Sequence, residues 1–136
     1  MYDSTLTQQS LPSDRYRLLL GTAICVFTSN NGFIIENLLR VDESVSWHTL
    51  IDQTSGRLRK HLEGKLPDHI IQLFFELVGM RNRIIHGFRI TNANGEQTIA
   101  TKDKSEIQFE ITEDYLIEFI HKNNDLSNML HEFRGF

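Results

Sequence analysis

Residues 67–87 read PDHIIQLFFELVGMRNRIIHG, and this stretch decides the fold. Pro67 suits the first turn of a helix and Asp68 puts a negative charge at its positive end, so we expect a long helix from Pro67 to at least His86. At about 100° per residue, its apolar side chains cover an arc of roughly 220°. A surface helix needs an apolar stripe of little more than about 100°. We therefore expect this helix to pack on two sides, against the chain's own core and against a partner subunit.

The segments before this helix also carry helical patterns, with apolar residues three and four positions apart. A first helix should begin near Asp14, after a serine cap, and the polar residues 29–32 interrupt or end it. Residues 33–41 then either resume the first helix or form a second, shorter one. Residues 47–62 show an amphipathic pattern that is weakened by Thr54, Ser55 and Gly56.

After Gly87 the pattern changes to alternating polar and apolar residues, which is typical of strands. The predicted strands cover residues 89–91, 97–101 and 106–111, and one face of the sheet should carry Ile99, Ile107, Phe109 and Ile111. Thr112 then begins a final helix, for which a bend is expected around Asn123-Asn124. The expected fold is mainly α: a bundle of four to five helices with a small β-hairpin insertion before the last helix. The length of 136 residues fits a single domain, residues 1–136.

The net charge of -4 is unevenly distributed. Residues 57–89 hold seven basic and three acidic residues, a balance of +4, and the remainder of the chain carries -8. Such a division fits a basic site on an acidic body that does not coat nucleic acid indiscriminately. Solvated basic helix faces explain the same numbers equally well.

Several classes of protein are disfavoured by the sequence. The apolar stretch Leu18–Phe27 is about half as long as a membrane span requires, so we assign it to a core helix and expect no membrane association. The polar N-terminus lacks the features of a secretory signal, which favours the cytoplasm. The lone Cys25 is predicted to be buried filler. The histidines and acidic residues show no metal-ligand spacing, so we expect no metal and no cofactor.

Arg81 lies at the middle of the apolar arc, where burial of an unpaired guanidinium is costly. Either an acidic residue of another helix neutralises it, or it lines a cleft. Asn82 and His86 lie about 100° and 140° further round the helix, so that both border the face assigned to a partner. These three residues are the candidate catalytic group.

The pattern Arg-Asn-x3-His from Arg81 to His86, followed by Gly87, resembles the signature of the HEPN superfamily (higher eukaryotes and prokaryotes nucleotide-binding). The helix layout of nearly the whole chain is similar too. This resemblance implies a metal-independent endoribonuclease of the toxin or mobile-element defence type, which works as a homodimer with the two motifs facing each other.

In such an enzyme, His86 would be the general acid or base toward the 2'-hydroxyl and the leaving 5'-oxygen. Arg81 would stabilise the phosphate, and Asn82 would orient His86 or donate to the phosphate. Further candidate RNA-binding residues are Arg83, Arg57, Arg59 and Lys60, which could guide the backbone.

Two alternatives stay open: a non-catalytic HEPN-like module that binds RNA or a regulatory protein, and a purely structural helical dimer. Relatives controlled by a nucleotidyltransferase antitoxin often carry a tyrosine two places after the histidine. Phe88 occupies that place here and has no hydroxyl, so this mode of control is not expected.

Overall fold

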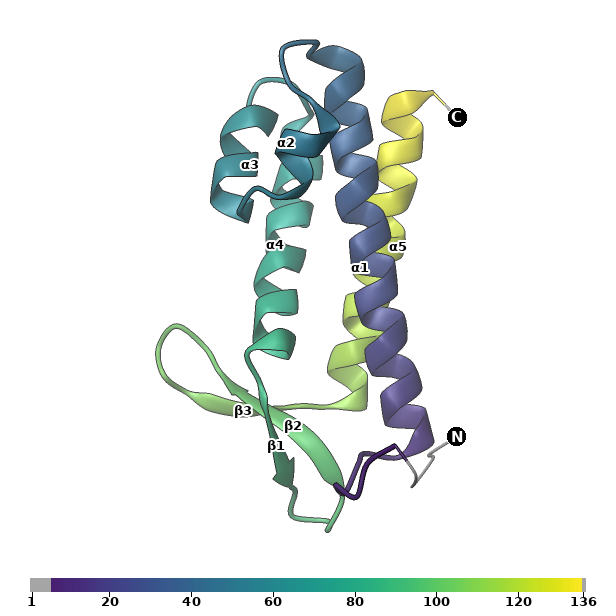
Figure 1. Ribbon diagram of the computed structural model, residues 1–136, viewed down its shortest axis with the longest axis vertical. Coiled ribbons are helices and arrows are strands. Elements are labelled where there is room, and N and C mark those ends of the chain that lie inside the picture. The colour runs from purple at the N-terminus through teal and green to yellow at the C-terminus, as the bar shows by residue number, and fades with distance from the viewer. Residues whose placement is uncertain (1–5, 136) are drawn as a thin grey trace.

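The computed structural model describes residues 6–135, which form five helices and one three-stranded antiparallel sheet (Figure 1). The elements follow one another as α1 (Asp14–Val41), α2 (Trp47–Ile51), α3 (Ser55–Leu62), α4 (Asp68–Ile85), β1 (Phe88–Thr91), β2 (Gln97–Lys102), β3 (Gln108–Ile111) and α5 (Glu113–Arg134). The prediction of a mainly helical chain with strands before the last helix is confirmed.

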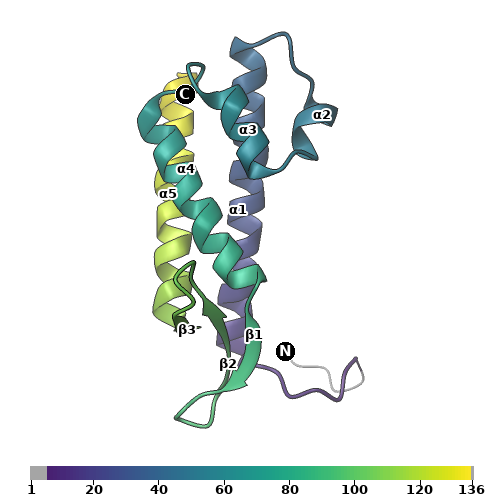
Figure 2. The ribbon, with the colours of Figure 1, turned by 90° about the vertical axis from the view of Figure 1, so that its left-hand side faces the viewer.

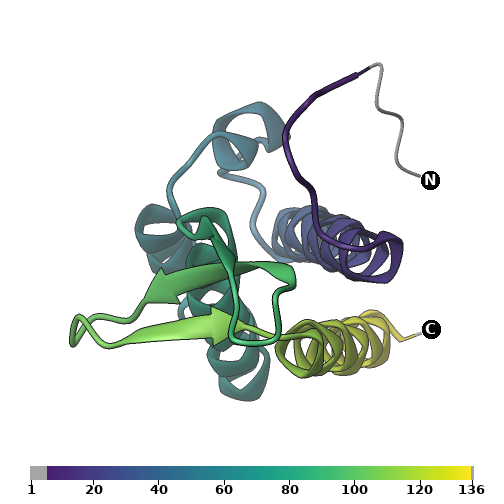
Figure 3. The same ribbon diagram turned by 90° about the horizontal axis from the view of Figure 1, so that it is seen from below.

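The three long helices form the body of the molecule. Helices α1 and α5 lie side by side and run in the same direction, whereas α4 runs opposite to both (Figures 1 and 2). An ion pair from Arg15 to Glu113 at 2.7 Å and one from Arg134 to Glu36 at 3.6 Å join α1 to α5 near either end. The short helices α2 and α3 lie beside the first half of α4, and the sheet lies at the opposite end of the bundle (Figures 1 and 3).

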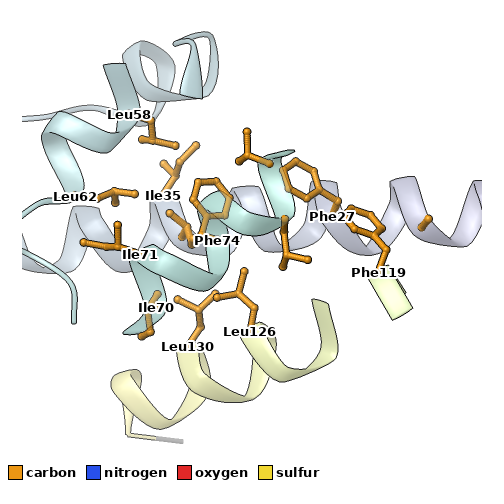
Figure 4. Close-up of a cluster of buried hydrophobic side chains, with 14 of the residues drawn as sticks. Phe27, Ile35, Leu58, Leu62, Ile70, Ile71, Phe74, Phe119, Leu126 and Leu130 are labelled. Atoms are coloured by element: carbon orange, nitrogen blue, oxygen red, sulfur yellow. The ribbon is translucent and has the colours of Figure 1, made fainter. Parts of the chain in front are cut away.

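One aromatic side chain from each long helix meets at the centre of the core. The ring of Phe27 in α1 stacks on Phe74 of α4 and on Phe119 of α5, with 6.0 Å between centroids in both pairs. All three rings are buried, and aliphatic side chains surround them (Figure 4). Stacked pairs of this kind contribute about 0.5–1.5 kcal/mol each beyond their buried area, so Phe27 helps to hold the three helices together.

Helix α1 continues without a break through residues 29–32, so the residues after them resume the first helix. Asn30 does not end the helix because its side chain is buried and donates to the carbonyl oxygen of Asn123 at 2.8 Å. Asn123 is satisfied in turn by the Phe119 carbonyl, at 2.9 Å, and α5 continues through it. Asn30 was expected to interrupt α1 and Asn123 to bend α5. Instead, these two residues form a hydrogen bond between the two helices.

The predicted helical stretch 47–62 is divided into α2 and α3. The Thr54 hydroxyl caps the first turn of α3, where it accepts from the Arg57 amide at 3.4 Å. The backbone of Thr54 is extended, as is usual for an N-cap residue, so α2 cannot continue through it into α3.

Strand β2 pairs with both β1 and β3, so the insertion is a three-stranded sheet. The expectation for Ile107 is wrong: its side chain is 63% exposed and it precedes β3. The amides of Ser105 and Ile107 both donate to Asp103 Oδ1, and Glu106 adopts a positive φ of 64°. This turn removes Ile107 from the alternation of the strand.

Most of the wide apolar arc of α4 is covered within the chain. Its buried side chains are Ile70, Ile71, Phe74, Leu77, Val78 and Ile84. Leu58 and Leu62 of α3 cover one side of the helix, while α1 and α5 cover the other (Figure 4). The chain itself therefore covers most of the arc, while Ile85 at its end is 52% exposed.

Helix α1 is more apolar and more exposed than expected. It is long and apolar enough to span a bilayer: one 18-residue window has a mean hydropathy of 1.6, with 28% of that window buried inside the chain. Core helices of soluble proteins can meet the same criterion, and α1 does contribute eight buried residues. Cys25 lies on the uncovered side of α1 and is exposed, so its prediction as buried filler is wrong.

Gly87 connects α4 to β1 at a point where no side chain fits. A Cβ atom there would overlap Ile99 Cγ2 of β2 and lie 3.0 Å from the Ala100 carbonyl oxygen. We expect Gly87→Ala to lower the free energy of unfolding by about 1–3 kcal/mol, because the sheet would have to shift away from α4. Chemical denaturation measures this change.

Gly79→Ala is the matched control, since nothing lies within 4 Å of a Cβ at that position in α4. That substitution should stabilise the protein by roughly 0.5–1 kcal/mol, as expected of glycine replaced inside a helix. Equal effects of the two substitutions would contradict the close approach at Gly87.

Candidate functional site

Arg81 lies in the last turns of α4 and points toward α1. Its guanidinium carbon is 4.9 Å from the centre of the Phe27 ring, so the cation sits over the central aromatic residue of the core. A partly buried cation–π contact of this kind stabilises by about 0.5–2 kcal/mol. Desolvation by burial lowers the pKa of Arg81 from its ordinary value.

Asn82 holds the guanidinium from the side. Its Oδ1 accepts from Arg81 Nε at 3.2 Å and from Nη2 at 2.9 Å. Among residues 6–135 no acidic side chain forms an ion pair with Arg81, so the expected neutralising carboxylate is not found there. A guanidinium has five N–H donors, and those not used by Asn82 remain for another acceptor.

His86 is the C-cap of α4, and its side chain is exposed. Its backbone amide donates to the Asn82 carbonyl at 3.0 Å, which fixes the last turn. The sequence suggested that Asn82 could orient His86, but the side-chain oxygen of Asn82 is bound by Arg81. His86 is about 7.5 Å further along the helix axis than Arg81 and about 140° round it. One chain therefore presents the guanidinium and the imidazole in different directions.

This turn is anchored by two contacts that were not predicted from the sequence. The hydroxyl of Tyr115 in α5 donates to the carbonyl of Met80, the residue before Arg81, at 3.1 Å. Arg83, expected on an exposed polar strip, is half-buried and donates to the Lys102 carbonyl in β2. Tyr115 matched the apolar pattern of the last helix, so nothing in the sequence marked its hydroxyl.

The other candidate basic residues lie on α3. The guanidinium of Arg59 is 4.8 Å from the Phe75 ring centre and its Nε is 3.4 Å from Glu63 Oε1. Phe75 precedes Arg81 by six residues, about 9 Å along α4. Arg57 and Lys60 are exposed on the same short helix. These residues form a group separate from the motif at Arg81–His86. Only an extended ligand could contact both groups.

Cavities are found elsewhere on the surface. Four of them, with volumes of about 530, 710, 450 and 400 Å³, are lined by other residues than Arg81, Asn82 and His86. Within residues 6–135, no group of three or more His, Cys, Asp or Glu side chains is placed to hold a metal ion.

Comparison with models of protein families, with curated proteins and with solved structures finds no significant match to this chain. The resemblance to the HEPN superfamily therefore rests on the residues from Arg81 to Gly87 and on the order of the helices.

The hydroxyl of Tyr115 makes the anchoring of the motif testable by pH. Burial raises its pKa to about 12 from 10.0, an effect that Arg83 partly offsets. The unfolded tyrosine ionises first, so the stability that this group contributes is present below about pH 10 and is lost as the pH rises toward 12. We expect Tyr115→Phe to cost about 1 kcal/mol at neutral pH, through the lost hydrogen bond to Met80, and to reduce the alkaline loss.

Urea denaturation at several pH values from neutral to alkaline checks this expectation. All other ionisable groups are common to the unmodified chain and to Tyr115→Phe. The difference between the two stability curves therefore gives the contribution of the Tyr115 hydroxyl. Parallel curves for the two proteins would contradict the burial of the hydroxyl.

Proposed function

We propose that this chain is a metal-independent endoribonuclease of the HEPN type, acting as a homodimer. The observation that carries the proposal is the un-neutralised guanidinium of Arg81, held by Phe27 and Asn82 five residues before the exposed His86. A buried acidic partner would have given Arg81 a structural role; without one, its free donors suit a phosphate.

The proposed reaction needs only groups that this chain, RNA and water provide. The 2'-hydroxyl of RNA attacks the adjacent phosphorus, and the 5'-oxygen leaves, which produces a cyclic phosphodiester end and a 5'-hydroxyl end. His86 serves one of the two proton transfers, from the 2'-hydroxyl or to the leaving 5'-oxygen, and water serves the other. Arg81 stabilises the extra negative charge on the phosphoryl oxygens. Asn82 keeps the guanidinium of Arg81 in place.

The partner subunit would complete the site. Because Arg81 and His86 of one chain diverge by about 140°, a two-fold axis could bring Arg81 of one chain opposite the partner subunit's His86. In this arrangement both motifs would face one composite cleft between the subunits. A defence or toxin role in the cytoplasm, under an antitoxin or another regulator, is part of the same proposal. Because Phe88 has no hydroxyl, that regulator would not act by nucleotide transfer to this position.

Cleavage of mixed RNA in the presence of EDTA tests the chemistry. We expect His86→Ala to reduce cleavage by about 10²–10⁴-fold and Arg81→Ala by about 10²–10³-fold, because proton transfer and charge stabilisation are lost. The loss in Asn82→Ala should be smaller, since the Phe27 contact of Arg81 remains. Gel analysis of end-labelled RNA measures the rates.

His69→Ala is the matched control, because His69 is an exposed histidine in the first turn of the same helix. It should cleave at the rate of the unmodified chain. Equal cleavage by all of these proteins would identify a contaminant, and no cleavage by any would refute the catalytic proposal.

Mixing two inactive variants tests the shared site. If Arg81 acts with the partner subunit's His86, a heterodimer of Arg81→Ala and His86→Ala chains has one intact site and one doubly damaged site. Random exchange should then restore roughly one quarter of the original activity, since half of the dimers are mixed and each has half of its sites. Light scattering must show a dimer; a monomer at high micromolar concentration, or no recovery on mixing, argues against the shared site.

A second candidate function is a non-catalytic module that binds RNA or a regulatory protein. The exposed basic residues Arg57 and Lys60 of α3 favour this role. RNA binding without cleavage by the unmodified chain would select it.

A further inference from the structure

The cavity of about 530 Å³ lies where the sheet meets the first turns of α1 and α5, at one end of the bundle (Figure 1). Its lining includes the N-cap residues of both helices, Ser13 and Thr112, and the turn from β1 to β2. Tyr16 also lines it and joins α1 to the sheet: its hydroxyl donates to the Ile111 carbonyl at 2.6 Å and accepts from the Ile99 amide at 3.2 Å. A cavity of this size suits a small molecule.

The charged residues that line this cavity are all acidic. They are Glu96, Glu110, Glu113 and Asp114. Arg15 forms an ion pair with Glu113 at 2.7 Å, whereas no ion pair within residues 6–135 involves the other three. The positive ends of the two helices together offset about one further charge. Roughly two negative charges therefore remain uncompensated in the lining.

Glu96 and Glu110 are held together by the side chain of one neutral residue. Asn92 Nδ2 donates to Glu96 Oε1 at 3.4 Å and to Glu110 Oε2 at 3.3 Å. The amide thus brings two like charges together and neutralises neither. The register places Arg89, the arginine of β1, on the opposite face of the sheet from Glu110, where it donates to Gln97 Oε1 at 2.8 Å. A cation in the cavity would relieve the repulsion between the two carboxylates.

A buried hydroxyl points to a ligand independently of this charge. Thr98 lines the cavity and is 6% exposed, and within residues 6–135 its Oγ1 has no hydrogen-bond partner. Ala100 pairs with Glu110, and Thr98 lies two residues from Ala100, so the side chains of Thr98 and Glu110 share one face of the sheet. A buried hydroxyl without a partner is costly, and a ligand with N–H donors would satisfy it.

We propose that this cavity binds a linear aliphatic diamine as its dication. One ammonium group has three N–H donors, which suits the carboxylates of Glu96 and Glu110 together with the Thr98 hydroxyl. The second positive charge matches the remaining negative charge of the lining. A metal ion fits less well, since no group of three His, Cys, Asp or Glu side chains in the described part of the chain is placed to hold one. The site is independent of the proposed function, because Arg81 and His86 do not line this cavity.

Isothermal titration calorimetry of the full chain with 1,4-diaminobutane tests this inference. We expect Glu110→Gln to weaken binding roughly 10- to 150-fold, because a charged acceptor is lost. n-Butylamine has the same carbon chain with a single ammonium group, and it should bind more weakly than the diamine. Ca²⁺ and Mg²⁺ are titrated in parallel and should also bind more weakly.

Thr98→Val separates the binding role of the hydroxyl from a structural one. Because Thr98 Oγ1 has no partner, this substitution should leave the stability of the ligand-free chain unchanged or raise it, as chemical denaturation measures. It should nevertheless weaken binding of the diamine roughly 10-fold or more. A less stable ligand-free variant, or a variant that binds the diamine as the unmodified chain does, would overturn the role of Thr98 and with it the inference.

Glu43→Gln is the matched control, since it removes the same charge from an exposed residue beyond the other end of α1. It should bind the diamine as the unmodified chain does. Equal binding by the Glu43 and Glu110 variants would indicate unspecific attraction to an acidic protein. That result, no binding of the diamine, or tighter binding of Ca²⁺ or Mg²⁺ would overturn the diamine site, whereas none of them would affect RNA cleavage.

Discussion

The ring of Phe27 joins three helices and carries a cation at the same time. The Phe27 ring joins α1 to α4 through Phe74 and to α5 through Phe119, and the guanidinium of Arg81 lies 4.9 Å from its centre. The candidate site is thus built directly on the core and not on a loop. A shift of α1 relative to α4 would change both the packing of the rings and the position of Arg81, so the stability of the bundle and the geometry of the site depend on one contact.

Much of the fold follows from local patterns in the sequence. The long helix from residue 68, the strands after Gly87 and the start of the last helix were all predicted, because helical and strand periodicities are properties of short segments. Asn30 and Ile107 were misjudged for the opposite reason. The helix passes through Asn30 because a partner 93 residues away, Asn123, satisfies its side chain, and Ile107 leaves its strand because a side chain in the preceding turn binds its backbone.

The sequence identified the residues of the candidate site but not the contacts that their side chains make. Arg81 stood out because it interrupts an apolar face, and that reasoning offered only a carboxylate or a cleft to account for it. An aromatic ring from another helix and the adjacent Asn82 were not considered, since helical periodicity says nothing about contacts between helices. The support from Tyr115 was equally hidden, because a tyrosine in an apolar position gives no sign of where its hydroxyl points.

Gly87 follows the candidate catalytic histidine directly, yet it is required for a different reason. Its constraint comes from steric contact with β2, whereas any constraint on His86 would come from chemistry. In the proposed enzyme, two different selective pressures would therefore act on neighbouring positions. Descendants of this chain that lost their chemistry could replace the histidine freely but would have to retain the glycine. A lineage with the glycine and without the histidine would thus mark a domain that kept its architecture and changed its role.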